Sequence, residues 1–133
     1  MTAYIFSILC LLLLSAFFSA TETAFTSINR IKMKNMANDD VKNAKLVLKL
    51  EDRYDKLLST ILIGNNIANI GMTAIATVMF VALLGGSLGP TASTVVMTVA
   101  VLIFGEISPK NIAKEHPEGF ALFAAPVMRG LMW

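Results

Sequence analysis

Polar side chains interrupt strongly apolar stretches of the sequence, and their types point to cation binding. Glu106 lies near the end of one such stretch, and Asn65 and Asn69 lie within another. A carboxylate at membrane depth costs about 2.5 kcal/mol or more, so it is expected to pair with another group and to mark a functional site. A bound cation is the first candidate for the partner of Glu106.

Asn65 and Asn69 are four residues apart, so on a helix they share one face, whereas Asn66 points roughly 100 degrees away. Their amide oxygens could coordinate a cation. Alternatively, they form hydrogen bonds between neighbouring helices, with Gly64 and Gly71 permitting close approach of the backbones. A carboxylate at similar depth favours the ligand site.

Pro109 follows Glu106 by three residues and has no N–H. In an α-helix the carbonyl of Gly105, four residues before Pro109, would therefore lose its usual donor. Gly105 has no side chain to obstruct this carbonyl, which would lie beside the Glu106 carboxylate. Alternatively, Pro109 only ends or kinks the helix. We place Pro109, Lys110 and Asn66 near the expected ion path rather than among the ligands.

The depths of these polar groups along their helices are similar. The residues concerned are Ser19, Asn65, Asn69 and Glu106. Each lies eight to thirteen residues from a basic residue at the end of its segment, which is roughly 12 to 20 Å along a helix. They can therefore converge in one layer near the bilayer centre. An all-oxygen set with a carboxylate suits Mg²⁺ better than the metals that prefer thiolate or imidazole.

Two further ionisable residues have simpler interpretations. Glu22 completes an S-x-x-E capping box that starts at Ser19, which would put it at the membrane interface in the first turn of a restarted helix; alternatively, it touches the ion path. His116 is expected in a solvated loop, because one imidazole without other nitrogen or sulfur ligands makes no zinc site. The sequence has no nucleophile triad, Gly-rich phosphate loop or metal-hydrolase motif, so we do not expect an enzyme.

Membrane-spanning helices must hold these residues in place. The chain of 133 residues is 56% hydrophobic and 15% charged, which is too apolar for an ordinary soluble domain. Residues 2–27, 57–84 and 91–112 approach or exceed the roughly 20 residues that a spanning helix needs. The first of them lacks the basic start and cleavage site of a signal peptide. We therefore predict an all-α membrane protein with three transmembrane helices in a single domain, residues 1–133.

The basic residues predict the orientation in the membrane. Eight of the eleven Lys and Arg residues lie in residues 29–56, and none lies in residues 85–90. By the positive-inside rule, the connection 29–56 faces the cytoplasm and the N-terminus faces outward, in a multi-pass protein of the cell membrane. The formal net charge of +2 is too small to indicate nucleic acid as a partner.

Two segments are expected near the membrane surface. Part of the connection 29–56 carries an apolar stripe, which favours either a helix that lies on membrane lipid or a solvated helical linker. Residues 119–133 form a weaker apolar segment, either an interfacial helix or part of a further span. Because three helices seal a face lined by Asn and Gly poorly from lipid, we also expect a homodimer.

Three ordered motifs resemble one known family. The motifs are Phe17-Phe18-Ser19-Ala20-Thr21-Glu22-Thr23-Ala24, Leu57-Leu58-Ser59-Thr60-Ile61-Leu62-Ile63-Gly64-Asn65-Asn66-Ile67-Ala68-Asn69 and Phe104-Gly105-Glu106-Ile107-Ser108-Pro109-Lys110. They resemble the transmembrane domain of the CNNM/CorC magnesium transporters over nearly the whole chain. The resemblance implies a dimeric, Na⁺-coupled Mg²⁺ exporter with a dehydrated ion site. The implied ligands are Ser19, Asn65, Asn69, Gly105 and Glu106.

The resemblance also implies parts that residues 1–133 do not contain. Members of this family continue into a cytosolic helical region and a pair of CBS domains that binds ATP. Transport direction and Na⁺ coupling rest on the resemblance alone. An alternative function is a non-transporting membrane anchor or Mg²⁺ sensor, in which the same polar residues serve helix packing.

Overall fold

In the computed structural model, residues 2–132 form eight consecutive helical segments. They are α1 (Thr2–Ser27), α2 (Arg30–Asn38), α3 (Ala44–Asp52), α4 (Tyr54–Leu84), α5 (Gly89–Ala100), η1 (Val101–Ile107), α6 (Ser108–Glu115) and α7 (Pro117–Met132). No strand occurs in these residues, and Met1 and Trp133, the two ends of the predicted domain, lie outside the described part. The predicted all-α class is confirmed.

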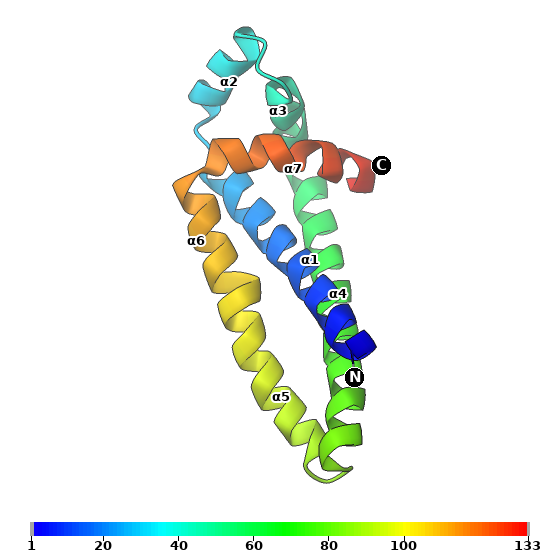
Figure 1. The fold of residues 1–133 in the computed structure, drawn as a ribbon. Coiled ribbons are helices and arrows are strands. Elements are labelled where there is room, and N and C mark those ends of the chain that lie inside the picture. Colours follow the sequence, from blue (N-terminus) through cyan, green and yellow to red (C-terminus); the bar gives the residue numbers. More distant parts are fainter. Residues whose placement is uncertain (1, 133) are drawn as a thin grey trace.

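Three long helices are apolar enough to cross a membrane. α1 has 26 residues, α4 has 31, and α5, η1 and α6 run on as one helix of 27 residues, Gly89–Glu115. The three predicted spans are therefore confirmed, although the second and third begin slightly earlier and the third ends slightly later than predicted. α1 packs along α4 on one side and along η1 and α6 on the other (Figure 1).

The apolar side chains of the spans divide into a buried and an exposed set. One buried cluster, which includes Phe18, Leu57 and Ile61, lies towards α2, α3 and α7. A smaller one joins α1, α4 and α5 through Ile8, Met72, Ala76 and Met97. Large exposed side chains include Phe6, Leu13, Ile63, Ile67, Ile70, Val95, Val99 and Phe104. Such an apolar outer surface fits a lipid environment, where it replaces the water that a soluble protein would face.

The turn between α4 and α5 depends on two glycines. Gly85 has a φ of +89°, a conformation that residues with a side chain rarely adopt. Gly89 begins α5 directly against α4, because a Cβ on Gly89 would lie 2.6 Å from the Cα of Val81. Pro90 sits in the first turn of α5, where a missing N–H leaves no helical bond unmade. The antiparallel pairing of the two helices therefore requires a residue without a side chain at Gly89.

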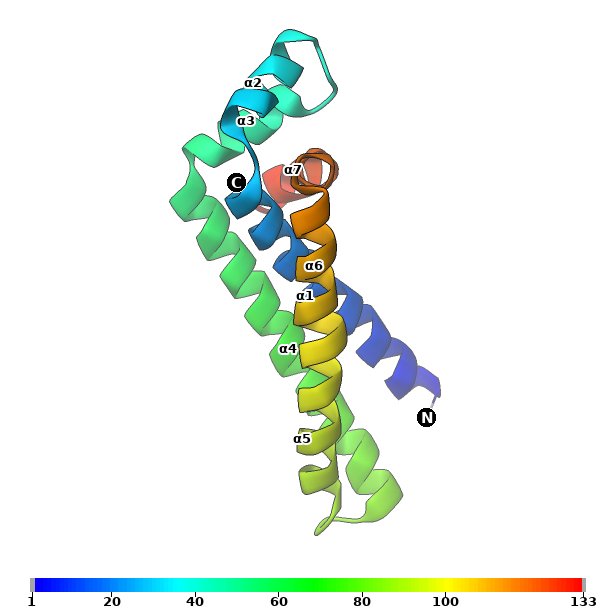
Figure 2. The same cartoon turned by 90° about the vertical axis from the view of Figure 1, so that its left-hand side faces the viewer.

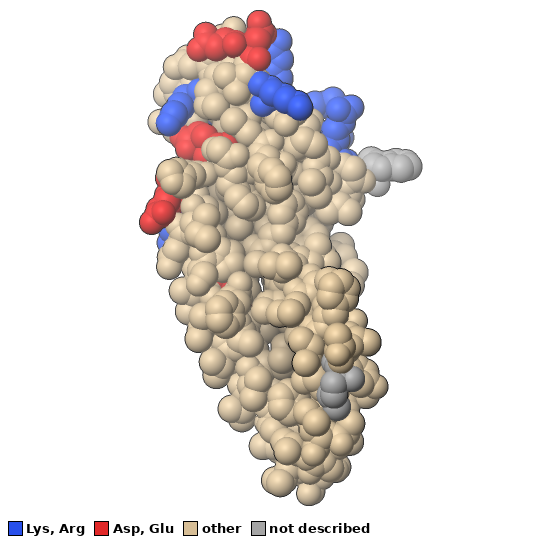
Figure 3. All heavy atoms as spheres, in the orientation of Figure 1, with Lys and Arg blue, Asp and Glu red and all other residues tan. Residues whose placement is uncertain are grey.

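Charged side chains gather at the end of the molecule where α2, α3 and α7 lie (Figure 3). Arg30 joins α2 to α3, with its guanidinium nitrogens 3.3 Å from Glu51 Oε2 and 2.8 Å from Asp52 Oδ1. The hydrogen bond that Arg30 donates to Asp52 is the main cause that raises the pKa of Arg30 above its ordinary value. This asymmetry of charge is the basis of the predicted cytoplasmic orientation, which itself stays a prediction.

The apolar stripe of the connection 29–56 packs within the protein. α3 buries Ala44, Val47 and Leu50, and it contacts both α2 and α7. α7 runs across the ends of the spans rather than alongside them (Figures 1 and 2). This is the orientation of an interfacial helix, the first of the two alternatives predicted for residues 119–133.

We expect Gly89→Ala to destabilise the α4–α5 pair by about 1 to 3 kcal/mol, because the new Cβ would overlap main-chain atoms of Val81. Gly86→Ala is the matched control, since a Cβ there meets nothing within 4 Å, and its effect should stay within about 0.5 kcal/mol. Thermal unfolding in a mild detergent, followed by circular dichroism, measures both variants. Equal stability of the two would contradict the close approach of α5 to α4.

Candidate cation site

The Ser15 hydroxyl is the point where α1 and α4 share polar contacts. Its Oγ lies 2.7 Å from Asn65 Oδ1 and 3.0 Å from Asn69 Oδ1. A hydroxyl carries one proton, so it donates to only one of the two acceptors at a time. The i, i+4 spacing puts both amides on one face of α4, as predicted, and this face meets α1 at Ser15. Three side-chain oxygens thus converge in the interior of the spans.

The third span reaches the same hydroxyl through the backbone of Gly105. A Cβ built on this buried glycine would lie 3.5 Å from Ser15 Oγ and 3.4 Å from Leu12 Cδ1. Both are ordinary van der Waals distances, so only a side chain larger than that of alanine would press on Ser15 and Leu12. The main chain of η1 thus packs close to the polar group of α1. We call Ser15, Asn65, Asn69 and Gly105 the oxygen cluster.

The π-helical turn at η1 changes which carbonyls Pro109 leaves without a donor. The N–H of Ser108 donates to the carbonyl of Ile103, five residues earlier. In that register the next donor would come from Pro109 and would serve Phe104, whereas an α-helical register would serve Gly105. Pro109 can serve neither. One donor is missing, and the carbonyl that loses it is that of Phe104 in the π register and that of Gly105 in an α register, both just before Glu106.

Glu106 directly follows Gly105 and is partly buried on η1. Hydrogen bonds and ion pairs among residues 2–132 involve other carboxylates: Glu51, Asp52 and Glu118 form the ion pairs. Glu106 thus lies beside the oxygen cluster, and its carboxylate takes part in none of these contacts. Lys110, four residues further along the chain, is also partly buried, on α6.

Ser19 lies one helical turn from Ser15, nearer the charged end. It is buried, and its main-chain carbonyl accepts a hydrogen bond from Thr23 Oγ1 at 3.1 Å. The structure therefore brings Ser15, and not Ser19, into contact with the two asparagines. Ser15 was not among the predicted ligands; its place one turn from Ser19, on the same face of α1, is the signal in the sequence that makes it a second candidate.

The other predicted residues lie around the cluster rather than in it. Glu22 is partly buried, and its main-chain carbonyl accepts from Thr26 Oγ1 at 2.7 Å. The capping-box interpretation of Ser19 and Glu22 is wrong, because α1 continues unbroken through both residues. Asn66 is exposed on α4, as expected from its rotation away from the face of Asn65, and His116 is exposed after α6.

A largely apolar groove that carries one amide and three threonine hydroxyls extends from Asn69 between α4 and α5. It has a volume of about 280 Å³ and is lined by Asn69, Thr73, Thr94, Met97, Thr98, Val101 and Leu102. Because a water molecule takes up about 30 Å³ in the liquid, the groove can hold several waters. One turn further along α4, Thr77 Oγ1 lies 3.4 Å from the hydroxyl of Ser93, which is fully buried. Polar groups thus continue from Asn69 towards the α4–α5 turn.

The ligand chemistry of this region is that of oxygen. No group of three or more His, Cys, Asp and Glu side chains that could hold a metal occurs within the described residues. Hydroxyl, amide, main-chain and carboxylate oxygens suit hard cations such as Mg²⁺ and Ca²⁺. The residues present therefore fit a hard cation far better than a zinc or copper ion.

Three apolar spanning helices that bring oxygens together in their interior define a multi-pass membrane domain with an intramembrane polar site. The model of the family described as "CNNM: Cyclin M transmembrane N-terminal domain" matches residues 5–133. The chain therefore belongs to the CNNM transmembrane domain family, which confirms the family named from the three motifs.

Relatives of this chain include bacterial membrane proteins. It is 39% identical over 131 residues to a "UPF0053 protein" of Haemophilus influenzae, covering 98% of this chain and 31% of that protein. It is 41% identical over 108 residues to a UPF0053 inner membrane protein of Escherichia coli, covering 81% and 25%. It is also 30% identical over 161 residues to a polyamine export protein of Salmonella typhimurium, covering 97% and 33%. The chain thus spans a third or less of the length of these relatives.

We expect Ser15→Ala to lower the free energy of unfolding by about 1 to 3 kcal/mol, because the amide oxygens of Asn65 and Asn69 lose their buried donor. Ser19→Ala removes the same atom one turn away and should cost less, since the polar contact that Ser19 makes uses its backbone. Denaturant or thermal unfolding without added divalent ions measures both. A larger loss of stability for Ser19→Ala than for Ser15→Ala would show that Ser19, and not Ser15, holds α1 to α4.

Proposed function

We propose that this domain transports Mg²⁺ across the cell membrane through the oxygen cluster. The observation that carries the proposal is the meeting of three spans at Ser15, which lies against the amide oxygens of α4 and the backbone of Gly105. Glu106 follows directly and supplies negative charge. Polar groups placed at this depth are costly, and such residues in membrane proteins usually mark ion pathways.

The cluster can hold Mg²⁺ with little rearrangement. The ion takes six oxygens in an octahedron at about 2.0 to 2.1 Å and gives up water reluctantly. Asn65 and Asn69 already direct their oxygens to the Ser15 hydroxyl, which would turn its proton outward and offer a lone pair. The Glu106 carboxylate and a carbonyl freed by Pro109 would add charge and dipole, and water would complete the octahedron. In this proposal Ser19 lies next to the site, towards the charged end.

The surroundings of the cluster suit alternating access. The groove beside Asn69 offers a hydrated approach from the side of the α4–α5 turn. η1 is a π-helical turn, and such turns are short, poorly satisfied and frequent at functional sites. We propose that η1 shifts against α1 and so opens the cluster to each side in turn, as in transporters with a site near the bilayer midplane.

Family resemblance adds the direction of transport and its regulation to this proposal. We propose export of Mg²⁺ coupled to Na⁺ entry, with residues 29–56 in the cytoplasm. Glu106 would then carry Mg²⁺ and Na⁺ in turn, because both are hard cations that bind carboxylate oxygen. A cytosolic pair of CBS domains in the full-length protein would regulate the exchange.

Polyamine export is a second candidate, because relatives from Haemophilus influenzae and Salmonella typhimurium carry that name at 29% and 30% identity. A polyamine is a long, flexible chain whose cationic groups lie several bonds apart, so it needs acceptors in a row. The groove beside Asn69 is the place to test for this role, but its polar groups are neutral hydroxyls and an amide. Convergence of oxygens on one point favours a small ion instead.

We expect a homodimer in which a second copy covers polar residues of the spans. The amide of Asn66, which lies outside the groove beside Asn69, is exposed in the single chain. Exposure of an amide to hydrocarbon is unfavourable, because no water is present to bond with it. Mass measurement in a mild detergent, corrected for the micelle, should give twice the mass of one chain. A monomer that still binds Mg²⁺ would contradict the dimer and leave the ion site standing.

We expect Glu106→Gln to weaken Mg²⁺ binding by on the order of tenfold or more, since a charged ligand is worth about 1.5 to 3 kcal/mol. Stability without Mg²⁺ should stay level or rise, because removal of a buried charge relieves its desolvation. Asn69→Ala deletes a neutral dipole and should weaken binding less, and Glu22→Gln should have the smallest effect. Titration of the melting temperature with Mg²⁺ compares all three with the parent protein.

Liposome flux with the full-length protein separates the candidate functions. Mg²⁺ flux that Glu106→Gln abolishes supports the transporter. Spermidine flux without Mg²⁺ flux would support polyamine export. Binding of Mg²⁺ without flux would indicate a sensor or anchor, and parental binding and flux in Glu106→Gln would make the carboxylate structural and overturn the proposal.

A further inference from the structure

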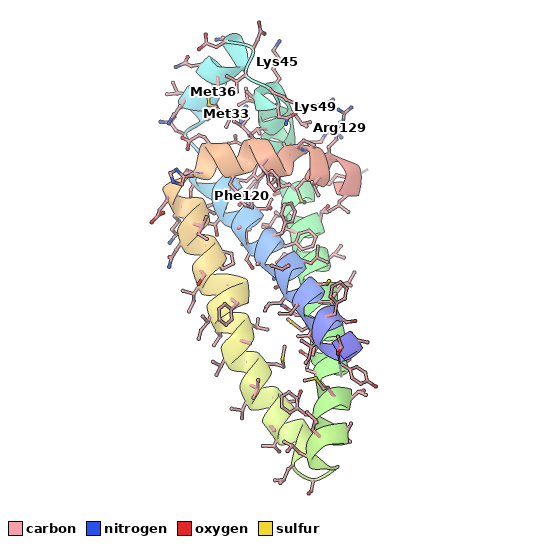
Figure 4. The ribbon with its side chains drawn as sticks, in the orientation of Figure 1. Met33, Met36, Lys45, Lys49, Phe120 and Arg129 are labelled. Carbon is pink, nitrogen blue, oxygen red and sulfur yellow. The ribbon has the colours of Figure 1, made fainter. Side chains whose placement is uncertain are left out.

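Three basic side chains extend on the same side of the junction between α3 and α7. Lys45 and Lys49 lie four residues apart on α3 and so share one face of that helix. Arg129 projects beside them from α7 (Figure 4). All three are exposed, and α3 and α7 are in contact. Two helices that are distant in sequence thus build one basic surface, which we call the α3–α7 basic cluster.

This cluster keeps its positive charge available. The ion pairs among residues 2–132 join Arg30 to Glu51 and Asp52, and Lys32 to Glu118. They leave Lys45, Lys49 and Arg129 for other partners. One carboxylate, that of Asp40, lines the same small cavity of about 290 Å³ as Lys45 and Arg129, together with Asn43. Three cations against one carboxylate leave the surface positive, and the cavity is large enough for a phosphate group.

The position of α7 places the cluster at the surface of the apolar layer. α7 runs across the ends of the spans (Figures 1 and 2). It exposes Phe123, Val127 and Leu131 at intervals of four residues, which form one apolar stripe. A neighbouring face, about 110 degrees around the helix, buries three alanines and Met128 against the protein. Arg129 lies two residues from Val127, which is about 200 degrees around the helix, so it points away from the stripe.

This arrangement is that of a helix at the boundary between hydrocarbon and headgroups. The exposed apolar stripe would enter the acyl layer, and Arg129 would lie at the level of the headgroups. A guanidinium binds phosphate through two parallel hydrogen bonds, and neighbouring lysines add point charge. A water-soluble acidic segment could satisfy the charges but would gain nothing from the apolar stripe on the other side of α7, whereas a phospholipid has a chemical group for each.

We propose that the α3–α7 basic cluster binds the headgroup phosphate of an anionic phospholipid in the leaflet where α7 lies. Lys45 and Arg129 bracket the phosphate at the cavity, and Lys49 adds attraction one turn further along α3. The acyl chains of the lipid cover Phe123, Val127 and Leu131. The bound lipid would join α3 to α7 and so fix the helical connection on the spans. This binding does not depend on the proposed transport of Mg²⁺.

The test compares anionic with zwitterionic lipid on the purified protein. Native mass spectrometry would measure retention of phosphatidylglycerol and of phosphatidylcholine with the same acyl chains. We expect the parent protein to prefer phosphatidylglycerol, and Lys45→Gln/Lys49→Gln/Arg129→Gln to reduce this preference by on the order of tenfold, since each basic residue near an anionic surface contributes appreciable attraction. Lys34→Gln/Arg53→Gln/Lys56→Gln removes the same number of exposed charges and should keep the preference. Circular dichroism confirms that both variants are folded.

Each other result overturns the proposal. An unchanged preference in the first triple variant would exclude the cluster, and an equal loss in the second would mean that the preference follows overall charge. Displacement of the lipid by millimolar glycerol phosphate would identify a site for free phosphate. No preference for phosphatidylglycerol, combined with binding of an acidic peptide that needs Lys45, Lys49 and Arg129, would identify a protein partner instead.

Discussion

The need of buried polar groups to bond with one another determines how these helices fit together. Hydrocarbon offers no water to Asn65 and Asn69, so their amide oxygens need a donor from another helix. The Ser15 hydroxyl lies 2.7 and 3.0 Å from these oxygens and donates to one of them at a time. This contact fixes the register of α1 against α4, and η1 packs close to the same point at Gly105. Packing and candidate function share one constraint, because the atoms that join the spans are also those that can bind a cation.

The third span shows how local sequence converts that constraint into an ion site. A regular α-helix would pair every carbonyl, and its oxygens would be unavailable to a ligand. The missing N–H of Pro109, in the π register at η1, releases a carbonyl just before Glu106. An unpaired carbonyl costs free energy unless another interaction offsets it, and a bound cation would do so. This links the irregular backbone to the carboxylate without requiring large rearrangement of the other two spans.

Patterns within one helix were predictable from the sequence, and relations between helices were not. Apolar length identified the three spans, and the i, i+4 spacing identified the shared face of Asn65 and Asn69. The choice between Ser15 and Ser19 depends on how α1 crosses α4, which counting depth along each helix separately does not determine. The missing donor at Pro109 was visible in the sequence, but the π register, in which Phe104 rather than Gly105 loses that donor, was not. The packing of α3 on α7 also depends on contacts between distant segments.

Phe18 and Gly64 separate the oxygen cluster from the charged end. Gly64 directly precedes Asn65, and a Cβ on Gly64 would lie 2.5 Å from the ring of Phe18. The ring therefore occupies the space that a side chain at Gly64 would need. Phe18 packs in the same buried cluster as Leu57 and Ile61. Towards the α4–α5 turn, by contrast, a threonine-lined groove reaches Asn69. If the domain transports an ion as proposed, this conformation has a polar approach on one side and an apolar barrier on the other. Passage towards α2, α3 and α7 then requires Phe18 to leave Gly64, so the small residue is needed to close the barrier as well as to pack the helices.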